Sequence, residues 1–165
     1  METILLANNG YIKLSDFAFA KSLPTRASYT RSVVGVPDII PPEMLLGRPY
    51  SYSVDWWQLG IAMFEMLTSR TPFFARSMFD THRNVLCSHR LEFPSRVSCS
   101  ARRTCRLFLQ VDVRKRLGCS SSDAKEVKEH VWFQHHVDWS TMVQRAHPAP
   151  YSMLTIRSSS LYNIE

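Results

Sequence analysis

The stretch from Val54 to Leu67 constrains the fold more than any other part of the sequence, because apolar residues cover nearly every face of the helix that it predicts. Such a helix is stable in water only when the rest of the chain surrounds it. Ser53 is placed to cap its start, and Asp55 lies favourably in its first turn. The stretch also contains polar residues and falls short of the ~18 residues of a membrane span. We therefore expect the central helix of a compact core, and no membrane partner.

A β-hairpin is predicted at the start of the chain. The apolar runs Ile4–Ala7 and Tyr11–Leu14 flank Asn9-Gly10, and an Asn-Gly pair supplies the positive φ angles of a tight turn. From Ala18 to Pro42 the sequence is irregular and rich in proline, which predicts an ordered loop of about 25 residues, and loops of this length in compact domains are usually functional.

Further helices are predicted where apolar residues recur at helical spacing, each opened by a serine near the N-cap position. They span Ser77–Ser88, Ser98–Gln110 and Ser122–His130. The remainder from Asp138 to Glu165 is loosely patterned and contains prolines and a run of serines. It predicts an extended tail that lies over the domain.

Composition limits the class of protein. The 165 residues are 45% hydrophobic and 21% charged, as in one folded domain rather than a disordered chain. A net charge of +6 favours acidic partners such as nucleic acid, anionic lipid or phosphorylated ligands, but charge alone does not choose among them. The cysteines form no Cys-x-x-Cys pair and the start lacks the basic region of a signal peptide, so we expect reduced thiols in a cytoplasmic or nuclear protein.

Several short motifs follow one another along the chain. Asp16-Phe17-Ala18 ends the predicted hairpin, and an aspartate at a strand end can present its carboxylate to a divalent cation. Taken alone, such an aspartate is more often a loop or capping residue. The order and spacing of the whole set carry more weight than any one motif. The later motifs are Gly35-Val36-Pro37-Asp38-Ile39-Ile40-Pro41-Pro42-Glu43, Asp55-Trp56-Trp57 and Asp112-Val113-Arg114-Lys115-Arg116-Leu117-Gly118.

In this order the motifs resemble those of the C-terminal lobe of eukaryotic protein kinases, in the AGC group of serine/threonine kinases that includes the cAMP-dependent kinase catalytic subunits. The resemblance covers essentially the whole chain. It implies a mainly α, protein-kinase-like fold with a small β-hairpin, C-terminal lobe only, with the N-terminal lobe absent. It places a partial kinase domain at residues 1–133 and a kinase tail segment at 134–165. Further matching features are Pro72-Phe73-Phe74, Leu109-Gln110-Val111-Asp112, Trp132-Phe133, Asp138-Trp139 and His147-Pro148-Ala149-Pro150-Tyr151.

The resemblance implies ATP and Mg²⁺ as cofactors. Asp16 matches the aspartate that holds magnesium, Phe17 the aromatic residue beneath the site, and Thr3 the position of an asparagine that binds a second magnesium. Ala18 replaces the motif's glycine, and a threonine hydroxyl is a weaker magnesium ligand than an amide carbonyl. The chain begins where the family's catalytic loop ends, so no catalytic aspartate is retained, and we expect weak or no ATP binding by this chain alone.

Other matches concern regulation and substrate binding. Ser32 matches the activation-loop phosphoacceptor and Lys21 a basic residue that pairs with its phosphate, although an ordinary exposed serine has equal weight. For Glu65 a local Lys or Arg partner is an equally good reading. The residues that match substrate-recognition positions are Glu2, Glu65, Val33, Pro37 and Ile40.

The remaining matches are structural. Glu43 and Arg116 match the partners of a buried ion pair, in which removal of either residue would strand the other charge. Asp55 matches a helix-capping aspartate that fastens the catalytic loop.

Two other site classes carry less weight. His130, His135 and His136 with Asp138 suggest a metal cluster, but neighbouring histidines in a basic chain are more often surface residues. The basic residues between 102 and 116 suggest a nucleic-acid patch, but their helical spacing favours a solvated face, so we expect no nucleic-acid partner.

We interpret the chain as a fragment of a serine/threonine kinase, whose parent uses ATP to phosphorylate protein substrates in a basic sequence context. The chain itself is expected to be inactive. The alternative is a non-catalytic, pseudokinase-type interaction module that binds a kinase, regulator or substrate through residues 77–88 and the basic surface.

Overall fold

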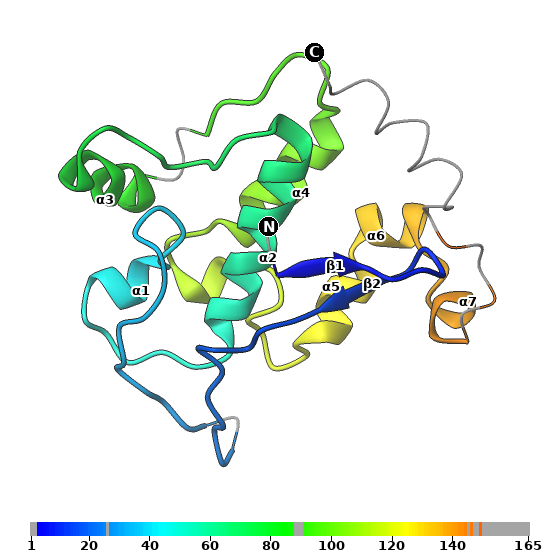
Figure 1. The fold of residues 1–165 in the computed structure, drawn as a ribbon, viewed down its shortest axis with the longest axis horizontal. Coiled ribbons are helices and arrows are strands. Elements are labelled where there is room, and N and C mark those ends of the chain that lie inside the picture. The colour runs from blue at the N-terminus through cyan, green and yellow to red at the C-terminus, as the bar shows by residue number, and fades with distance from the viewer. Residues whose placement is uncertain (1–2, 26, 88–90, 145, 147–148, 150–165) are drawn as a thin grey trace. The chain divides into compact units, whose positions relative to one another are not determined.

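The structure, a computed structural model, describes residues 3–25, 27–87, 91–144, 146 and 149 (Figure 1). It divides into two units, one formed by Met1–Ala20 with Val137–Glu165 and the other by Lys21–His136. The described residues are mainly helical, with one antiparallel pair of strands. This confirms the predicted mainly α fold class with its small hairpin.

The hairpin belongs to the first unit and consists of β1 (Ile4–Leu6) and β2 (Ile12–Leu14). Ile4 pairs with Leu14 and Leu6 with Ile12. Gly10 has a φ of 81°, and its amide donates to the Ala7 carbonyl at 2.8 Å. The strands are shorter than predicted because the turn takes up residues at the inner end of each apolar run.

The tail prediction was partly wrong, because a short helix, α7 (Trp139–Val143), forms within the segment expected to be extended. The Asp138 side chain caps it by accepting hydrogen bonds from the amides of Ser140 and Thr141. Such capping is a local interaction that a single aspartate before polar residues can provide. The part of the tail beyond residue 149 lies outside the described residues.

The core of the second unit forms between α2 (Ser53–Thr68) and α4 (Cys99–Phe108), which lie side by side in Figure 1. The helices approach each other closely at Gly60, where an added Cβ would lie 2.7 Å from Cβ of Phe108. Trp57 is fully buried at the centre and stacks on Phe73 with ring centroids 5.4 Å apart. The predicted central helix is therefore present and carries the core.

Serines were expected to cap the starts of four helices, and the structure confirms this for two of them. Ser77 caps α3 (Met78–Leu86) and Ser98 caps α4, each by accepting a hydrogen bond from an amide three residues on. Ser53, in contrast, is the first residue of α2 and caps nothing with its side chain. Nor does Ser122 cap α5 (Ala124–Glu129), which follows Asp123.

Besides α7, three short elements of the described residues were not predicted. They are α1 (Pro42–Leu45), a 3₁₀ helix at Val113–Lys115 and α6 (Val131–His136). Pro42 suits the first turn of α1, because a proline there loses no helical hydrogen bond. The irregular stretch predicted to reach Pro42 does so, apart from one bridge between Thr30 and Tyr50.

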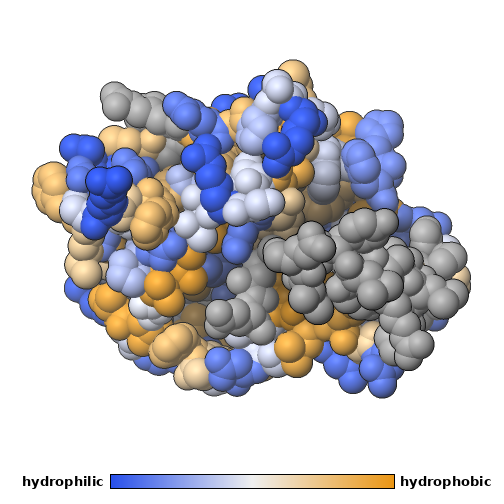
Figure 2. Space-filling view, turned by 45° about the horizontal axis from the view of Figure 1, so that its top comes forward, coloured by the Kyte–Doolittle hydropathy of each residue, from blue (hydrophilic) through white to orange (hydrophobic). Residues whose placement is uncertain are grey.

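Although α2 carries the core, it is not buried all round, because Leu59 and Met66 are exposed. Figure 2 shows hydrophobic side chains at the surface in several places on the face that it presents. Among the described residues, no helix is both long and apolar enough to cross a membrane.

These exposed apolar residues lead to a prediction about the isolated chain. We expect it to self-associate and to bind hydrophobic dyes, because apolar surface left in water favours contact with other apolar groups. The measurement is dye fluorescence together with light scattering, with the double variant Leu59→Gln, Met66→Gln expected to lower both signals. A monodisperse chain with a sharp melt above ~60 °C and no dye signal would contradict this expectation.

Candidate functional site

The hairpin brings two of the predicted cofactor residues, Thr3 and Asp16, to its open end. The amide and hydroxyl of Ser15 both donate to the Thr3 carbonyl, at 2.9 and 3.1 Å. Asp16 therefore follows a residue that is paired with Thr3. Asp16 and Phe17 have φ angles of 74° and 53°, so the chain turns sharply where the hairpin ends.

These residues do not by themselves fit a magnesium nucleotide. Asp16 and Thr3 are exposed, and Phe17 is 64% exposed instead of packed beneath a site. The described residues contain no group of three or more His, Cys, Asp or Glu side chains that could hold a metal ion. Magnesium keeps several waters and needs carboxylates together with fixed phosphates, which a lone exposed carboxylate does not provide.

The predicted phosphoacceptor and its basic partner lie together in the second unit. Lys21 Nζ donates to Ser32 Oγ at 3.2 Å and to Thr30 Oγ1 at 2.6 Å. Ser32 is exposed. The contact with Thr30 was not anticipated from the sequence, and it is the shorter of the two.

The residues proposed for substrate recognition are not gathered into one described surface. Val33 is 63% exposed, whereas Ile40 is 7% exposed and packs in a small cluster with Met44 and Tyr50. Glu65 is half-buried in α2 and Pro37 is half-buried in the preceding loop. Glu2 lies outside the described residues.

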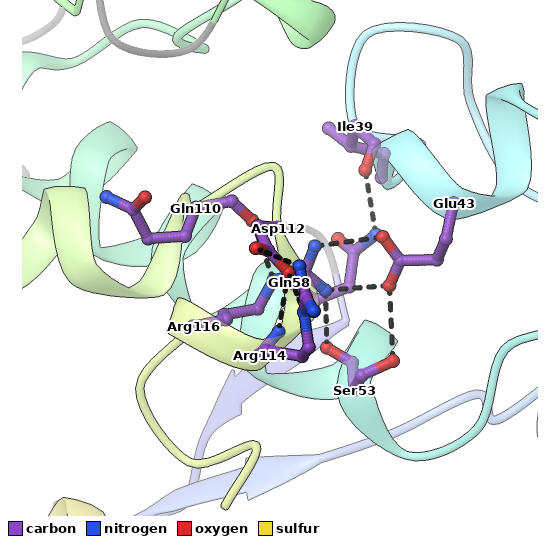
Figure 3. Close-up of polar contacts among 8 residues, drawn as sticks. All are labelled: Ile39, Glu43, Ser53, Gln58, Gln110, Asp112, Arg114 and Arg116. Carbon is purple, nitrogen blue, oxygen red and sulfur yellow. Dashed lines mark hydrogen bonds and ion pairs between the residues drawn. The ribbon is translucent and has the colours of Figure 1, made fainter.

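Glu43 and Arg116 meet in a buried, bidentate ion pair (Figure 3). Arg116 Nη1 donates to Glu43 Oε1 at 2.7 Å and Nη2 donates to Oε2 at 2.8 Å. The same guanidinium donates to the carbonyls of Ser53 and Gln110, at 2.9 and 3.0 Å. Its carbon lies 5.0 Å from the ring centroid of Trp57. The pair thus ties α1, the start of α2 and the turn after α4 to one another.

Two further polar contacts, drawn with the ion pair in Figure 3, were not predicted from the sequence. The Ser53 hydroxyl donates to Glu43 Oε1 at 3.2 Å, so the residue expected to cap α2 supports the ion pair instead. Gln58 Nε2 donates to the Ile39 carbonyl at 2.9 Å (Figure 3). A polar residue among the apolar positions of the helix was the only signal for Gln58.

Asp55 lies in the first turn of α2, where the structure places it near Asp123. Partial removal from water raises the pKa of Asp55, and the nearby Asp123 carboxylate raises it further. The neighbouring Trp56 donates from Nε1 to Asp123 Oδ1 at 3.0 Å. The charged form of Asp55 is therefore less favourable at this end of α2 than in water.

The alternative site classes find little support in the described part of the chain. His130 accepts from the Trp132 amide, and His136 Nδ1 lies 2.6 Å from the Trp132 carbonyl, so these rings take part in local helix contacts. Arg102 and Arg106 donate to main-chain carbonyls around α4. Arg116 is buried in the ion pair. Much of the basic group therefore has a structural role.

Comparison with known proteins identifies the family. Residues 1–133 match the protein kinase domain. The chain is 37% identical over 150 residues to cAMP-dependent protein kinase type 3 of Saccharomyces cerevisiae, an alignment that covers 91% of this chain and 36% of that protein. It is 36% identical to cAMP-dependent protein kinase catalytic subunit 2 of Drosophila melanogaster, over 99% of this chain and 46% of that protein.

A human relative agrees with these two. The cAMP-dependent protein kinase catalytic subunit PRKX of Homo sapiens is 38% identical, over 87% of this chain and 39% of that protein. The chain spans less than half the length of each of the three relatives. The chain therefore belongs to the protein kinase domain family, as a relative of the cAMP-dependent, AGC-type kinases.

Proposed function

We propose that this chain forms part of the C-terminal lobe of a serine/threonine kinase, and that its 165 residues alone do not transfer phosphate. The proposed parent activity is transfer of the terminal phosphoryl group of ATP to serine or threonine in a basic protein context. The similarity to cAMP-dependent kinases supports the parent activity. The cytoplasm or nucleus is the proposed location.

The observation that carries the proposed inactivity is the exposure of the Asp16-Phe17 turn without a surrounding group of metal ligands in the described residues. Phosphoryl transfer depends mainly on positioning and on stabilising charge. Asp16 would be the magnesium ligand, with Thr3 and Phe17 beside it. When bound, ATP would supply the transferable phosphoryl group and magnesium would neutralise charge on its phosphates, but we propose that this chain alone holds them weakly or not at all.

We propose roles for the other residues on the same assumption, that the chain is part of a kinase C-terminal lobe. Ser32 would be the phosphoacceptor of the activation loop and Lys21 the partner of its phosphate. Glu43, Arg116 and Asp55 would be structural. Residues 1–133 would form the partial kinase domain and 134–165 the kinase tail. The proposed substrate-recognition residues are Glu2, Glu65, Val33, Pro37 and Ile40.

A phosphotransfer assay tests the proposal. The purified chain is incubated with Mg-ATP and an arginine-rich serine peptide, and Asp16→Ala serves as the matched control. We expect no phosphopeptide and a nucleotide affinity no better than about millimolar. Phosphopeptide formed by the unaltered chain but not by Asp16→Ala would contradict the proposed inactivity.

A non-catalytic interaction module is the second candidate. The observation that favours it is the exposure of apolar side chains at and before α3, where Phe79 is 76% exposed and Phe74 and Met78 are also exposed. Such a surface is typical of contacts with other proteins. Sequencing the transcript upstream of Met1 and assaying any longer protein separates the candidates. Asp16-dependent transfer by the longer protein supports a kinase, and its absence supports the interaction module.

A further inference from the structure

A tyrosine outside the predicted site joins the loop around Ser32 to the residues before α2. Tyr50 is buried in the cluster with Ile40 and Met44. The Thr30 amide donates to the Tyr50 carbonyl at 2.9 Å, and the Tyr50 amide donates to the Thr30 carbonyl at 3.0 Å. The Tyr50 hydroxyl donates to the Ser32 carbonyl. One buried residue thus binds the main chain on both sides of Arg31.

Lys21 contacts the same short segment through side chains. Its ammonium group donates to the hydroxyls of Thr30 and Ser32. Lys21 and Ser32 are both exposed, and contacts of an exposed ammonium group contribute little to stability. The hydrogen bonds of Tyr50 differ from those of Lys21, because Tyr50 is buried and its partners in this segment are main-chain atoms.

The contacts that Tyr50 makes with the loop therefore do not depend on the side chain at position 32. Tyr50 binds the carbonyl of Ser32, which remains whatever side chain or modification the residue carries. We propose that Tyr50 is the positioning residue that keeps residues 30–32 bound to the segment before α2 in the unmodified chain. This closed arrangement does not require phosphorylation of Ser32. The inference does not depend on any catalytic activity of the chain.

Limited proteolysis of the full, phosphatase-treated chain tests the role of Tyr50. Trypsin cleaves the Arg31–Ser32 bond only when the segment opens, so the cleavage rate follows the population of the open form. Tyr50→Phe removes the hydroxyl and keeps the buried ring. Because one hydrogen bond is lost, we expect cleavage roughly 3- to 10-fold faster. Each rate is divided by that of a peptide with the same sequence around the bond.

Two matched variants complete the experiment. Tyr29→Phe makes the same chemical change at an exposed ring in the same loop, and we expect its rate to stay within about twofold of the unaltered chain. Ser32→Ala should also stay within about twofold, since its carbonyl still accepts the Tyr50 bond. An unchanged rate for Tyr50→Phe would overturn the proposal. So would an increase for Ser32→Ala as large as that expected for Tyr50→Phe.

Hydrogen exchange of the unaltered chain provides a measurement that needs no variant to fold. The amides of Thr30 and Tyr50 donate to each other's carbonyls, so both should exchange slowly. Exchange of either amide at the rate of an unstructured peptide would overturn the proposed closure.

Discussion

Replacing Glu43 by alanine is expected to lower the free energy of unfolding by roughly 3–5 kcal/mol, because the Arg116 charge would remain buried without its partner. The Arg116 side chain is fully buried and that of Glu43 is 5% exposed, so water cannot replace the lost contact. Arg116→Ala is expected to have a comparable effect. Urea unfolding followed by circular dichroism measures both, and soluble yield is a second readout.

The double variant Glu43→Ala, Arg116→Ala distinguishes an ion pair from two independent residues. Its effect should be clearly smaller than the sum of the single effects, because no unpaired charge is left behind. Strict additivity would show that the two residues do not interact. Arg114→Ala is the matched control, since Arg114 is 89% exposed and its contact with Asp112 lies at the surface. Surface pairs contribute about 0–1 kcal/mol.

Replacing Trp57 by alanine is the second change with a large expected effect. The ring is fully buried between Phe73 and the Arg116 guanidinium. Removal of a large buried aromatic side chain costs about 3–5 kcal/mol, since contacts are lost and a cavity remains. Leu59→Ala, on an exposed position of the same helix, should cost much less.

A second variant at Trp57 separates the ring from its indole nitrogen. Trp57 Nε1 is buried, and among the described residues it has no hydrogen-bond partner. Trp57→Phe removes this unsatisfied donor while it keeps an aromatic ring, so it should destabilise far less than Trp57→Ala. Equal losses from the two substitutions would indicate that the indole nitrogen does have a stabilising partner. Chemical unfolding followed by circular dichroism avoids the change in tryptophan fluorescence.

The two largest expected effects belong to one structural unit. Trp57 lies against the guanidinium that binds Glu43, and the same guanidinium binds the carbonyl of Ser53 at the start of α2. Residues in direct contact do not contribute independently to stability. Variants at Trp57 and Arg116 should therefore couple, and the loss in the combined variant should differ from the sum of the separate losses.

Local patterns in the sequence predicted the elements that local interactions form. Asn9-Gly10 marked the hairpin because the turn needs positive φ angles, and the structure has β1 and β2 on either side of it. Ser77 and Ser98 marked the starts of α3 and α4 because a serine cap acts on amides three residues away. Short helices such as α6 and α7 were missed, since a few residues carry too little periodic signal.

Less of the candidate site could be predicted from the sequence. The order of motifs was sufficient to select Asp16, Ser32 and Glu43, and it led to the kinase family that the comparisons support. It could not indicate that Ser53 supports the ion pair, because a serine before an apolar run has the same pattern whether or not it caps. Nor did any pattern mark Tyr50, whose bonds reach residues 18 and 20 positions earlier in the chain.

By itself, then, the sequence determined the family, the central helix and the local turns and caps, since each depends on residues close together in the chain or on the order of motifs. Only the tertiary structure decided which other groups join the pair of Glu43 and Arg116 that the order of motifs had matched, among them Ser53 and Trp57. Glu43 and Arg116 are 73 positions apart, and their spacing says nothing about the distance between them. Burial explains why Arg116 needs its partner more than Arg114 does, because a charge removed from water requires partners that an exposed charge does not. Arg114 and Arg116 are two positions apart, yet one is at the surface and the other is fully buried.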